Sequence, residues 1–147
     1  MVVELRGPGG KALRNPTEEV TDIETQVLPY LSQALLEMDR LQGIGIAANQ
    51  IRVPYRWFVD KSRRTFINPR ILEMEDKVAI VEGCLSLPER WFEVERFKKI
   101  KVEYWDLDNN RVEAEFKEIG AYIFQHEIDH LNGILVEDHG TRRYAGS

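Results

Sequence analysis

Two histidines, four residues apart near the C-terminal end, constrain this chain more than any other feature. In the stretch FQHEIDHLNG, His126, Glu127 and His130 form an H-E-x-x-H motif, the pattern of a helix-borne metal site with an adjacent acidic base. In a helix the two imidazoles lie one turn apart on the same face and can reach one ion. The motif alone leaves open a polar surface helix whose histidines fall four apart by chance.

A catalytic metal normally has three protein ligands and one position for water, so a third ligand is needed. The metzincin pattern continues through Gly133, but Val136 stands where its third histidine belongs. The potential ligands at 137–139 lie beyond the Gly133 break and do not fall where the peptidase families need them. The third ligand is therefore expected upstream of the motif.

Cys84, in the segment EGCLSLP, is the strongest upstream candidate. A thiolate is a good ligand for zinc or ferrous iron, and a Cys/His/His set leaves a position open for water. Gly83 permits close backbone approach, and the end of an apolar strand is a usual place for a site residue. The alternative is a buried, inert cysteine that packs as a small hydrophobe.

The segment GIGIAANQ, residues 43–50, superficially satisfies a dinucleotide-binding fingerprint. That fingerprint must follow a strand and open a helix, whereas this segment follows a helix and runs into Pro54, so we reject it. A tight turn that brings Gln50 toward a site is the preferred interpretation. A plain helix-to-strand connection with an exposed glutamine is the alternative.

Hydrophobic periodicity predicts an α+β protein. An amphipathic helix is expected over residues 23–41, with Pro29 either starting its regular part or kinking it, and Gly43 as its C-cap. A second helix, carrying H-E-x-x-H, should run from about 118 to 131. Between them we expect strands at 55–60, 65–67, a β-branched run at 77–87 that breaks at Gly83, 100–105 and 112–116.

Length and charge limit the function. We expect residues 1–147 to form a single catalytic domain, with an irregular tail from about 139 to 147. The net charge of −5 argues against nucleic-acid binding through overall attraction, although not against a local basic patch. No signal peptide or membrane span is apparent, and one cysteine precludes an intrachain disulfide. A cytoplasmic location is expected.

Together, GIGIAANQ, EGCLS and QHEID followed by His130 resemble the three signatures of peptide deformylase, in the same order; ALRNPTEEV is similar to that family's opening segment. The resemblance covers residues 10–138. It implies antiparallel strands packed around a central H-E-x-x-H helix, with an N-terminal amphipathic helix. It also implies removal of the formyl group from the N-terminal formyl-methionine of nascent polypeptides, which releases formate.

The resemblance carries residue roles with it. It implies that the metal is bound by Cys84, His126 and His130. It implies that Glu127 is the general base and acid, and that Gln50 and the backbone N–H of Leu85 form the oxyanion hole. The substrate, with its methionine side chain, would lie against Ile44, Gly45, Ile80, Gly83, Ile119, Tyr122 and Ile123. Ile80 and Ile119 could instead be core residues, and Tyr122 is bulkier than the expected aliphatic residue.

Glu82 and Arg96 resemble an ion pair that the family places behind the metal ligands, where such partners orient ligand side chains. Asp129 could orient a histidine too, but we interpret it as a solvated helix carboxylate. The resemblance implies Fe²⁺ as the physiological ion, with Zn²⁺, Ni²⁺ or Co²⁺ as substitutes.

The partners expected are N-formyl-methionyl peptides, for an enzyme that is a monomer and binds neither membranes nor specific nucleic acids. The chain lacks the C-terminal helix of familiar bacterial members and is similar to short, phage-encoded forms, for which the cytoplasm would be the host's. Transient ribosome association is therefore not expected through such a helix. Two alternatives stay open: an H-E-x-x-H metallopeptidase with a different third ligand, and a structural zinc site. The latter needs a fourth ligand, for which His139 is the only spare histidine.

Overall fold

The computed structural model describes residue 2, residues 10–139 and residues 141–143. The helical segments are η1 Gly10–Arg14, α1 Ile23–Gln26, α2 Leu28–Arg40, η2 Ala48–Ile51, α3 Ile119–Leu131 and α4 Val136–His139. The strands are β1 Gly45–Ala47, β2 Trp57–Asp60, β3 Thr65–Cys84, β4 Leu87–Trp105, β5 Arg111–Lys117 and β6 Thr141–Arg143. This arrangement confirms the predicted α+β class.

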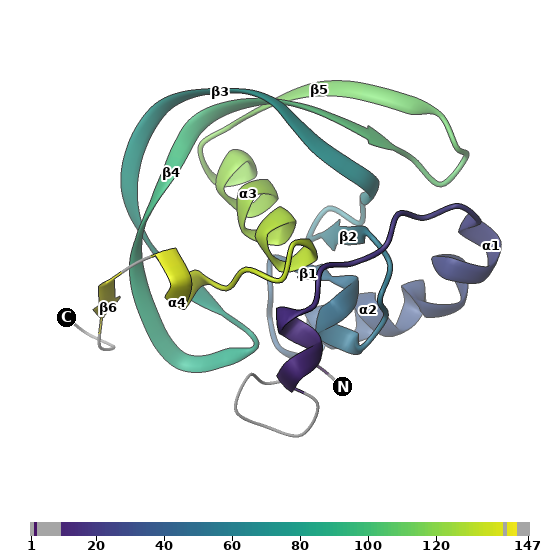
Figure 1. Ribbon diagram of the computed structural model, residues 1–147, viewed down its shortest axis with the longest axis horizontal. Coiled ribbons are helices and arrows are strands. Elements are labelled where there is room, and N and C mark those ends of the chain that lie inside the picture. The colour runs from purple at the N-terminus through teal and green to yellow at the C-terminus, as the bar shows by residue number, and fades with distance from the viewer. Residues whose placement is uncertain (1, 3–9, 140, 144–147) are drawn as a thin grey trace.

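One antiparallel sheet dominates the fold. Its strands follow the order β1-β2-β3-β4-β5, and β6 pairs with the other end of β4. β3 and β4 form a long, curved hairpin, and the sheet bends around α3, which lies near the centre of the molecule (Figure 1). β6 falls within the stretch that we expected to be an irregular tail. Pairing with β4 explains why this segment forms a strand. The exposed edge of β4 offers free backbone N–H and C=O groups, with which even a segment without hydrophobic periodicity can pair.

The N-terminal helical region is divided in two. α1 ends at Gln26 and α2 begins at Leu28, with Pro29 in the first turn of α2. A proline fits there because the first N–H groups of a helix have no intrahelical partner. The predicted C-cap at Gly43 is wrong: α2 closes at Leu41, and the left-handed residue is Gln42, with φ 56°.

β3 and β4 are each longer than the sequence pattern suggested. The expected break at Gly83 is absent, since β3 runs through Gly83 to Cys84. β4 starts at Leu87, well before the expected strand at 100–105. The register of the hairpin shifts between Ile67 and Arg70, between Ile71 and Glu73, and again at Gly83. The first two shifts fall inside β3 and interrupt the alternation of its side chains between the two faces of the sheet.

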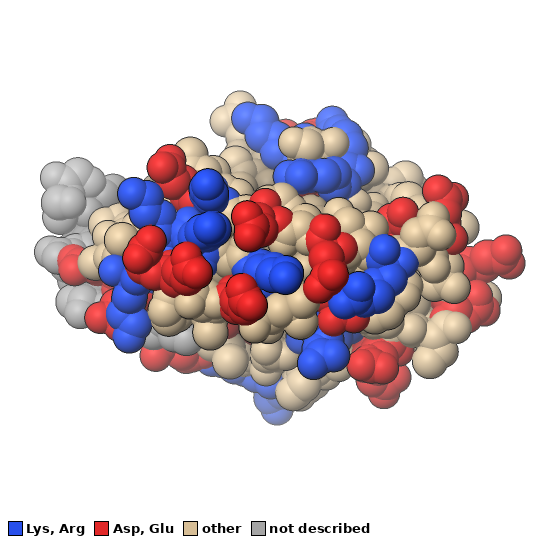
Figure 2. Space-filling view, turned by 90° about the horizontal axis from the view of Figure 1, so that it is seen from above, with Lys and Arg blue, Asp and Glu red and all other residues tan. Residues whose placement is uncertain are grey.

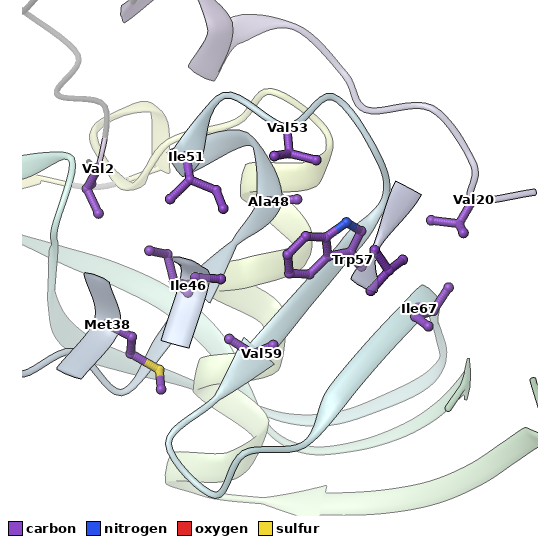
Figure 3. Close-up of a cluster of buried hydrophobic side chains, with 12 residues drawn as sticks. Val2, Val20, Met38, Ile46, Ala48, Ile51, Val53, Trp57, Val59 and Ile67 are labelled. Carbon is purple, nitrogen blue, oxygen red and sulfur yellow. The ribbon is translucent and has the colours of Figure 1, made fainter. Parts of the chain in front are cut away.

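Two apolar clusters fix the elements that surround α3. The first joins α2, β1, η2 and the start of β3 around the fully buried Trp57 (Figure 3). The second packs α3 against the sheet through Phe124, whose ring lies 5.2 Å from that of Phe58 and 5.5 Å from that of Phe66. The second cluster contains side chains of α3 itself, and the first holds β1 and η2, which contact α3. Packing in the core therefore sets the position of the H-E-x-x-H segment.

The surface above the β3–β4–β5 sheet carries charges of both signs. Acidic and basic side chains are interspersed there (Figure 2). Glu73 lies opposite Lys101, Glu75 opposite Lys99, and Lys101 opposite Glu115, an arrangement in which cross-strand neighbours attract one another. In the part of the chain that is described, no helix is both long and apolar enough to span a membrane.

Candidate metal centre

The end of β3 meets the middle of α3 at a group of three potential metal ligands. Cys84 comes from the strand, whereas His126 and His130 come from the helix. Their ligand atoms all lie within 4.8 Å of one another, and Cys84 Sγ is 3.2 Å from His130 Nε2. A tetrahedral ion with bonds of about 2.0–2.3 Å has ligand atoms about 3.3–3.8 Å apart. The donor set therefore fits one such ion with little movement.

The electrostatics favour the thiolate form of Cys84, which is the form that binds metal. Burial raises the pKa of this thiol. The nearby imidazoles of His130 and His126 outweigh that effect, through their charge and hydrogen bonds, and hold the pKa of Cys84 well below its usual range.

An ion-pair network supports His126 from behind. Its Nδ1 atom lies 2.9 Å from Glu82 Oε1, which leaves Nε2 to face the other ligands. Arg96 donates to both oxygens of Glu82, at 2.8 and 2.9 Å. Burial raises the pKa of Glu82, but Arg96 and His126 lower it to about 2. Glu82 is thus held ionised as an acceptor for the ring of His126.

Asp129 belongs to the same network. Its Oδ2 atom accepts a hydrogen bond of 2.6 Å from Arg96, which is buried. The interpretation of Asp129 as a solvated carboxylate is therefore wrong. This contact could not be predicted from local patterns, because Arg96 lies on β4 and reaches α3 only through the fold.

Glu127 lies beside the ligands and is buried. Its Oε1 atom has no hydrogen-bond partner among the described residues. The other oxygen, Oε2, faces the backbone of Gly45, where an added Cβ would lie only 2.7 Å away. Burial raises the pKa of this carboxyl, a shift toward the range in which a carboxylate can take and return a proton near neutral pH.

Gln50 is buried and faces the cysteine segment, so the exposed-glutamine alternative is wrong. Its Oε1 accepts from the backbone N–H of Ala47 at 2.9 Å. Its Nε2 then donates to Ser86 Oγ at 3.2 Å and lies 3.9 Å from Cys84 Sγ. The amide group is thus oriented with its N–H groups toward Cys84 and Ser86.

Leu85 follows Cys84 and packs against the turn at Gly43. A Cβ on Gly43 would lie 2.8 Å from Leu85 Cδ1, so glycine allows the 43–50 turn and the cysteine segment to approach closely. Gly43 therefore has two roles: its N–H donates to the backbone oxygen of Met38 at 2.8 Å at the end of α2, and its missing side chain leaves room for Leu85.

Sequence reasoning missed Asn49 and Ser86. Asn49 is buried, and its Nδ2 donates to the backbone oxygen of His130 at 2.6 Å. Ser86 receives the hydrogen bond from Gln50. Their only sequence signal was adjacency to residues that had been singled out.

The acidic residues beyond Gly133 are directed elsewhere. Glu137 pairs with Arg14 at 2.9 Å, and Asp138 pairs with the same guanidinium at 2.5 Å. The side chain of His139 lies outside the described residues. A downstream third ligand among the two acids is thus disfavoured.

Three residues of the expected methionine pocket line one cavity of about 210 Å³: Ile44, Ile119 and Ile123. Ile44 is 51% exposed and Ile119 is 68% exposed, so Ile119 is not a core residue. Ile80 packs with Cys84 against the buried Leu87, and neither Ile80 nor Tyr122 lines this cavity.

Comparisons with known proteins agree with these observations. The sequence profile of the family described as polypeptide deformylase matches residues 3–144. The peptide deformylase of Thermotoga maritima is 37% identical over 138 residues, which are 91% of this chain and 84% of that protein. The peptide deformylase of Aquifex aeolicus is 40% identical over 142 residues, covering 89% of this chain and 84% of the relative.

Solved structures give the same result. The crystal structure of the Thermotoga maritima peptide deformylase superposes with a TM-score of 0.89 at 34% identity, and covers 96% of this chain and 97% of that one. A Plasmodium falciparum peptide deformylase in complex with an inhibitor gives a TM-score of 0.86 at 36% identity, over 96% and 89% of the two chains.

Proposed function

The chain belongs to the polypeptide deformylase family, and we propose that its reaction takes place at a divalent metal ion held by Cys84, His126 and His130. The family reaction is removal of the formyl group from the N-terminal methionine of nascent polypeptides. One observation carries the assignment of the centre: the three ligand atoms lie within 4.8 Å of one another, next to the buried carboxylate of Glu127.

When bound, the metal would act as a Lewis acid that lowers the pKa of a water molecule toward neutrality. Glu127 takes the proton of the attacking water on a carboxylate oxygen and later gives it to the leaving amine. Burial, which raises the pKa of Glu127, makes that carboxylate a better proton acceptor.

Gln50 and Leu85 stabilise the negative charge that develops on the formyl oxygen. Gln50 is suited to this because its own oxygen is held by Ala47, which directs Nε2 toward Cys84. The backbone N–H of Leu85 is the second donor. Loss of one donor of this kind typically costs about 10²–10³ in rate.

Substrate recognition is assigned to the apolar surface beside α3. Ile44 and Ile119 are large hydrophobic side chains that water reaches, and with Ile123 they line the cavity described above. We assign the methionine side chain to this surface; for Ile80 and Tyr122, which do not line the cavity, contact with the substrate stays a prediction. Gly45 and Gly83 are assigned to substrate binding because they match the substrate-binding positions that the family resemblance implies.

The remaining assignments follow from the family and the donor set. Fe²⁺ is proposed as the physiological ion, with Zn²⁺, Ni²⁺ or Co²⁺ as substitutes, since thiolate and imidazole suit each of them. We treat residues 1–147 as one catalytic domain, supported by the profile match over 3–144. Because the substrates are nascent polypeptides, we propose that the protein acts in the cytoplasm, where transient contact with ribosomes is compatible with this function. The monomeric state stays a prediction.

Formate release from a formyl-methionyl tripeptide tests the function. Protein purified without oxygen and loaded with Fe²⁺ or Ni²⁺ is compared with Glu127→Ala loaded in the same way. Formate from the parent and almost none from the variant is the expected result. If both are silent although metal is bound, the assignment of this reaction fails.

A further inference from the structure

We propose that Asn49 is a positioning residue for the metal centre: its side-chain amide fixes the helix end that carries His130 against the turn that carries Gln50. This inference rests on the proposed function, because it concerns the same centre. It adds a residue whose part in that centre was not apparent from the sequence pattern.

Two consecutive amides attach η2 to the two halves of the site. Asn49 reaches α3, where its Nδ2 donates to the His130 oxygen at 2.6 Å. Gln50 reaches the cysteine segment, where its Nε2 donates to Ser86 Oγ at 3.2 Å. Both side chains are 2% exposed. The short turn therefore ties a metal ligand on the helix to the segment that contains Cys84.

The two histidine ligands are held in different ways. His126 is oriented through its ring, because Nδ1 lies 2.9 Å from Glu82 Oε1. His130 Nδ1 is buried and has no hydrogen-bond partner among the described residues. Metal-binding histidines usually need an outer partner of this kind. For His130 the observed anchor is instead on the backbone, at the oxygen that Asn49 contacts.

That backbone oxygen lies where a helix needs outside partners. His130 is in the last turn of α3, whose carbonyls lack intrahelical N–H partners. Its oxygen accepts from the backbone of Gly133 at 3.0 Å and from Asn49 at 2.6 Å. Only the second bond comes from the turn that bears Gln50. Removal of the Asn49 side chain therefore breaks the link between the end of α3 and the turn that carries Gln50. The bond from Gly133, which closes the helix end, remains.

Loss of this bond should affect both metal binding and catalysis. A small displacement of His130 weakens the ligand set. The same displacement changes the distance between the ion and Gln50, and misplacement by about 1 Å can cost about 10²-fold in rate. Because no substrate contact is removed, kcat should fall more than KM rises.

Thr17 provides a matched control. Its Oγ1 donates to the backbone oxygen of Leu131 at 2.8 Å, one residue beyond the carbonyl that Asn49 contacts. The donor comes from the N-terminal segment, to which no site residue is assigned. Thr17→Val therefore removes a similar bond at the same helix end without releasing η2.

The experiment compares the parent, Asn49→Ala, Asn49→Asp and Thr17→Val, each with Co²⁺. Four quantities are measured: the Co²⁺ dissociation constant by chelator competition, the Co²⁺ absorption spectrum, the melting temperature of the metal-free protein, and kcat with KM. Asn49→Asp preserves volume but replaces the donor with an oxygen that faces the His130 carbonyl. If Asn49→Ala does not fold, Asn49→Asp is the variant that is compared with the parent and with Thr17→Val.

We expect both Asn49 variants to bind Co²⁺ about 10–100-fold more weakly, with an altered spectrum and a reduced kcat. Thr17→Val should match the parent in these readouts even if its melting temperature falls. If the Asn49 variants change only the melting temperature, as Thr17→Val does, Asn49 is merely structural and the proposal is wrong. If the parent itself neither binds Co²⁺ nor releases formate, the proposed function fails first.

Discussion

Nδ1 of His126 lies 2.9 Å from Oε1 of Glu82, and Arg96 donates two hydrogen bonds to the same carboxylate. A proposed metal ligand is thus oriented by an acid that is itself held by a buried base. Arg96 also donates to Asp129, which lies on α3, the helix that carries His126. One guanidinium therefore couples strand, helix and ligand.

Arg96→Ala should weaken metal binding about 10–100-fold, because Glu82 would lose the group that holds it toward His126. The variant also leaves two carboxylates at the site without their cation, a change that typically costs about 3–5 kcal/mol when the pair is buried. Co²⁺ dissociation constants and urea unfolding of the metal-free protein measure the two effects. Arg63→Ala, which removes a 52% exposed guanidinium from the equally exposed Asp39, should change neither by much. Unchanged metal affinity in Arg96→Ala would refute the positioning role.

Acid should destabilise the metal-free protein in part through Glu82. Its folded pKa is about 2, below the ordinary value of 4.5. A depressed folded pKa means that the unfolded chain binds the proton first as pH falls. The contribution of about 3 kcal/mol is therefore present above pH 4.5 and lost between 4.5 and about 2. Glu82→Gln removes it. The free energy of unfolding of the parent and the variant should thus converge over that interval, and a constant difference would contradict the assignment.

Gly45→Ala should reduce kcat by about 10² without removing the metal. The new Cβ would lie 2.7 Å from Glu127 Oε2 and 3.2 Å from Ile123 Cγ2, so the carboxylate must move, and misplaced catalytic groups are costly. Metal content and kcat are measured together. In a Glu127→Ala background the same substitution should have little further effect, because its target is gone. An additive loss in the double variant would mean that Gly45 acts elsewhere.

Local patterns made much of this site predictable. The i, i+4 spacing of His126 and His130 needs only a helix, and α3 occupies residues 119–131 against an expected 118–131. The choice of Cys84 as the third ligand followed from elimination together with the chemistry of thiolates. Each of these inferences depends on neighbours in sequence or on the kind of side chain available.

The remaining contacts arise only when distant segments meet. Asn49 and His130 are 81 residues apart, and Arg96 and Asp129 are 33 apart. The continuous β3–β4 hairpin was also hidden, because its register shifts interrupt the alternation from which strands are recognised. Whether such residues are buried and in contact depends on how distant segments pack, and a local sequence pattern does not describe that packing.

Phe124→Ala should destabilise the protein by about 3–5 kcal/mol, because it removes a buried ring from the core. Phe124 is 2% exposed and its ring lies 5.7 Å from that of Phe116. Urea unfolding of the metal-free variant measures the loss. Leu36→Ala, at a side chain that is 65% exposed, should stay within about 0.5 kcal/mol of the parent. A small effect of Phe124→Ala would mean that the aromatic cluster does not hold α3.

Metal removal distinguishes Cys84 from a ligand beyond the motif. A metal that binds only the folded chain stabilises it by about 2.7 kcal/mol at a concentration of 100 times its dissociation constant. Chelation should therefore lower the melting temperature of the parent, and added Co²⁺ should restore it. Cys84→Ala should abolish the response, because two histidines alone bind weakly, whereas His139→Ala should keep it. A full Co²⁺ response in Cys84→Ala, lost instead in His139→Ala, would transfer the third ligand to the downstream segment. Co²⁺ bound through Cys84 should also show thiolate-to-metal absorption, and the disappearance of that band in Cys84→Ala identifies the sulfur directly.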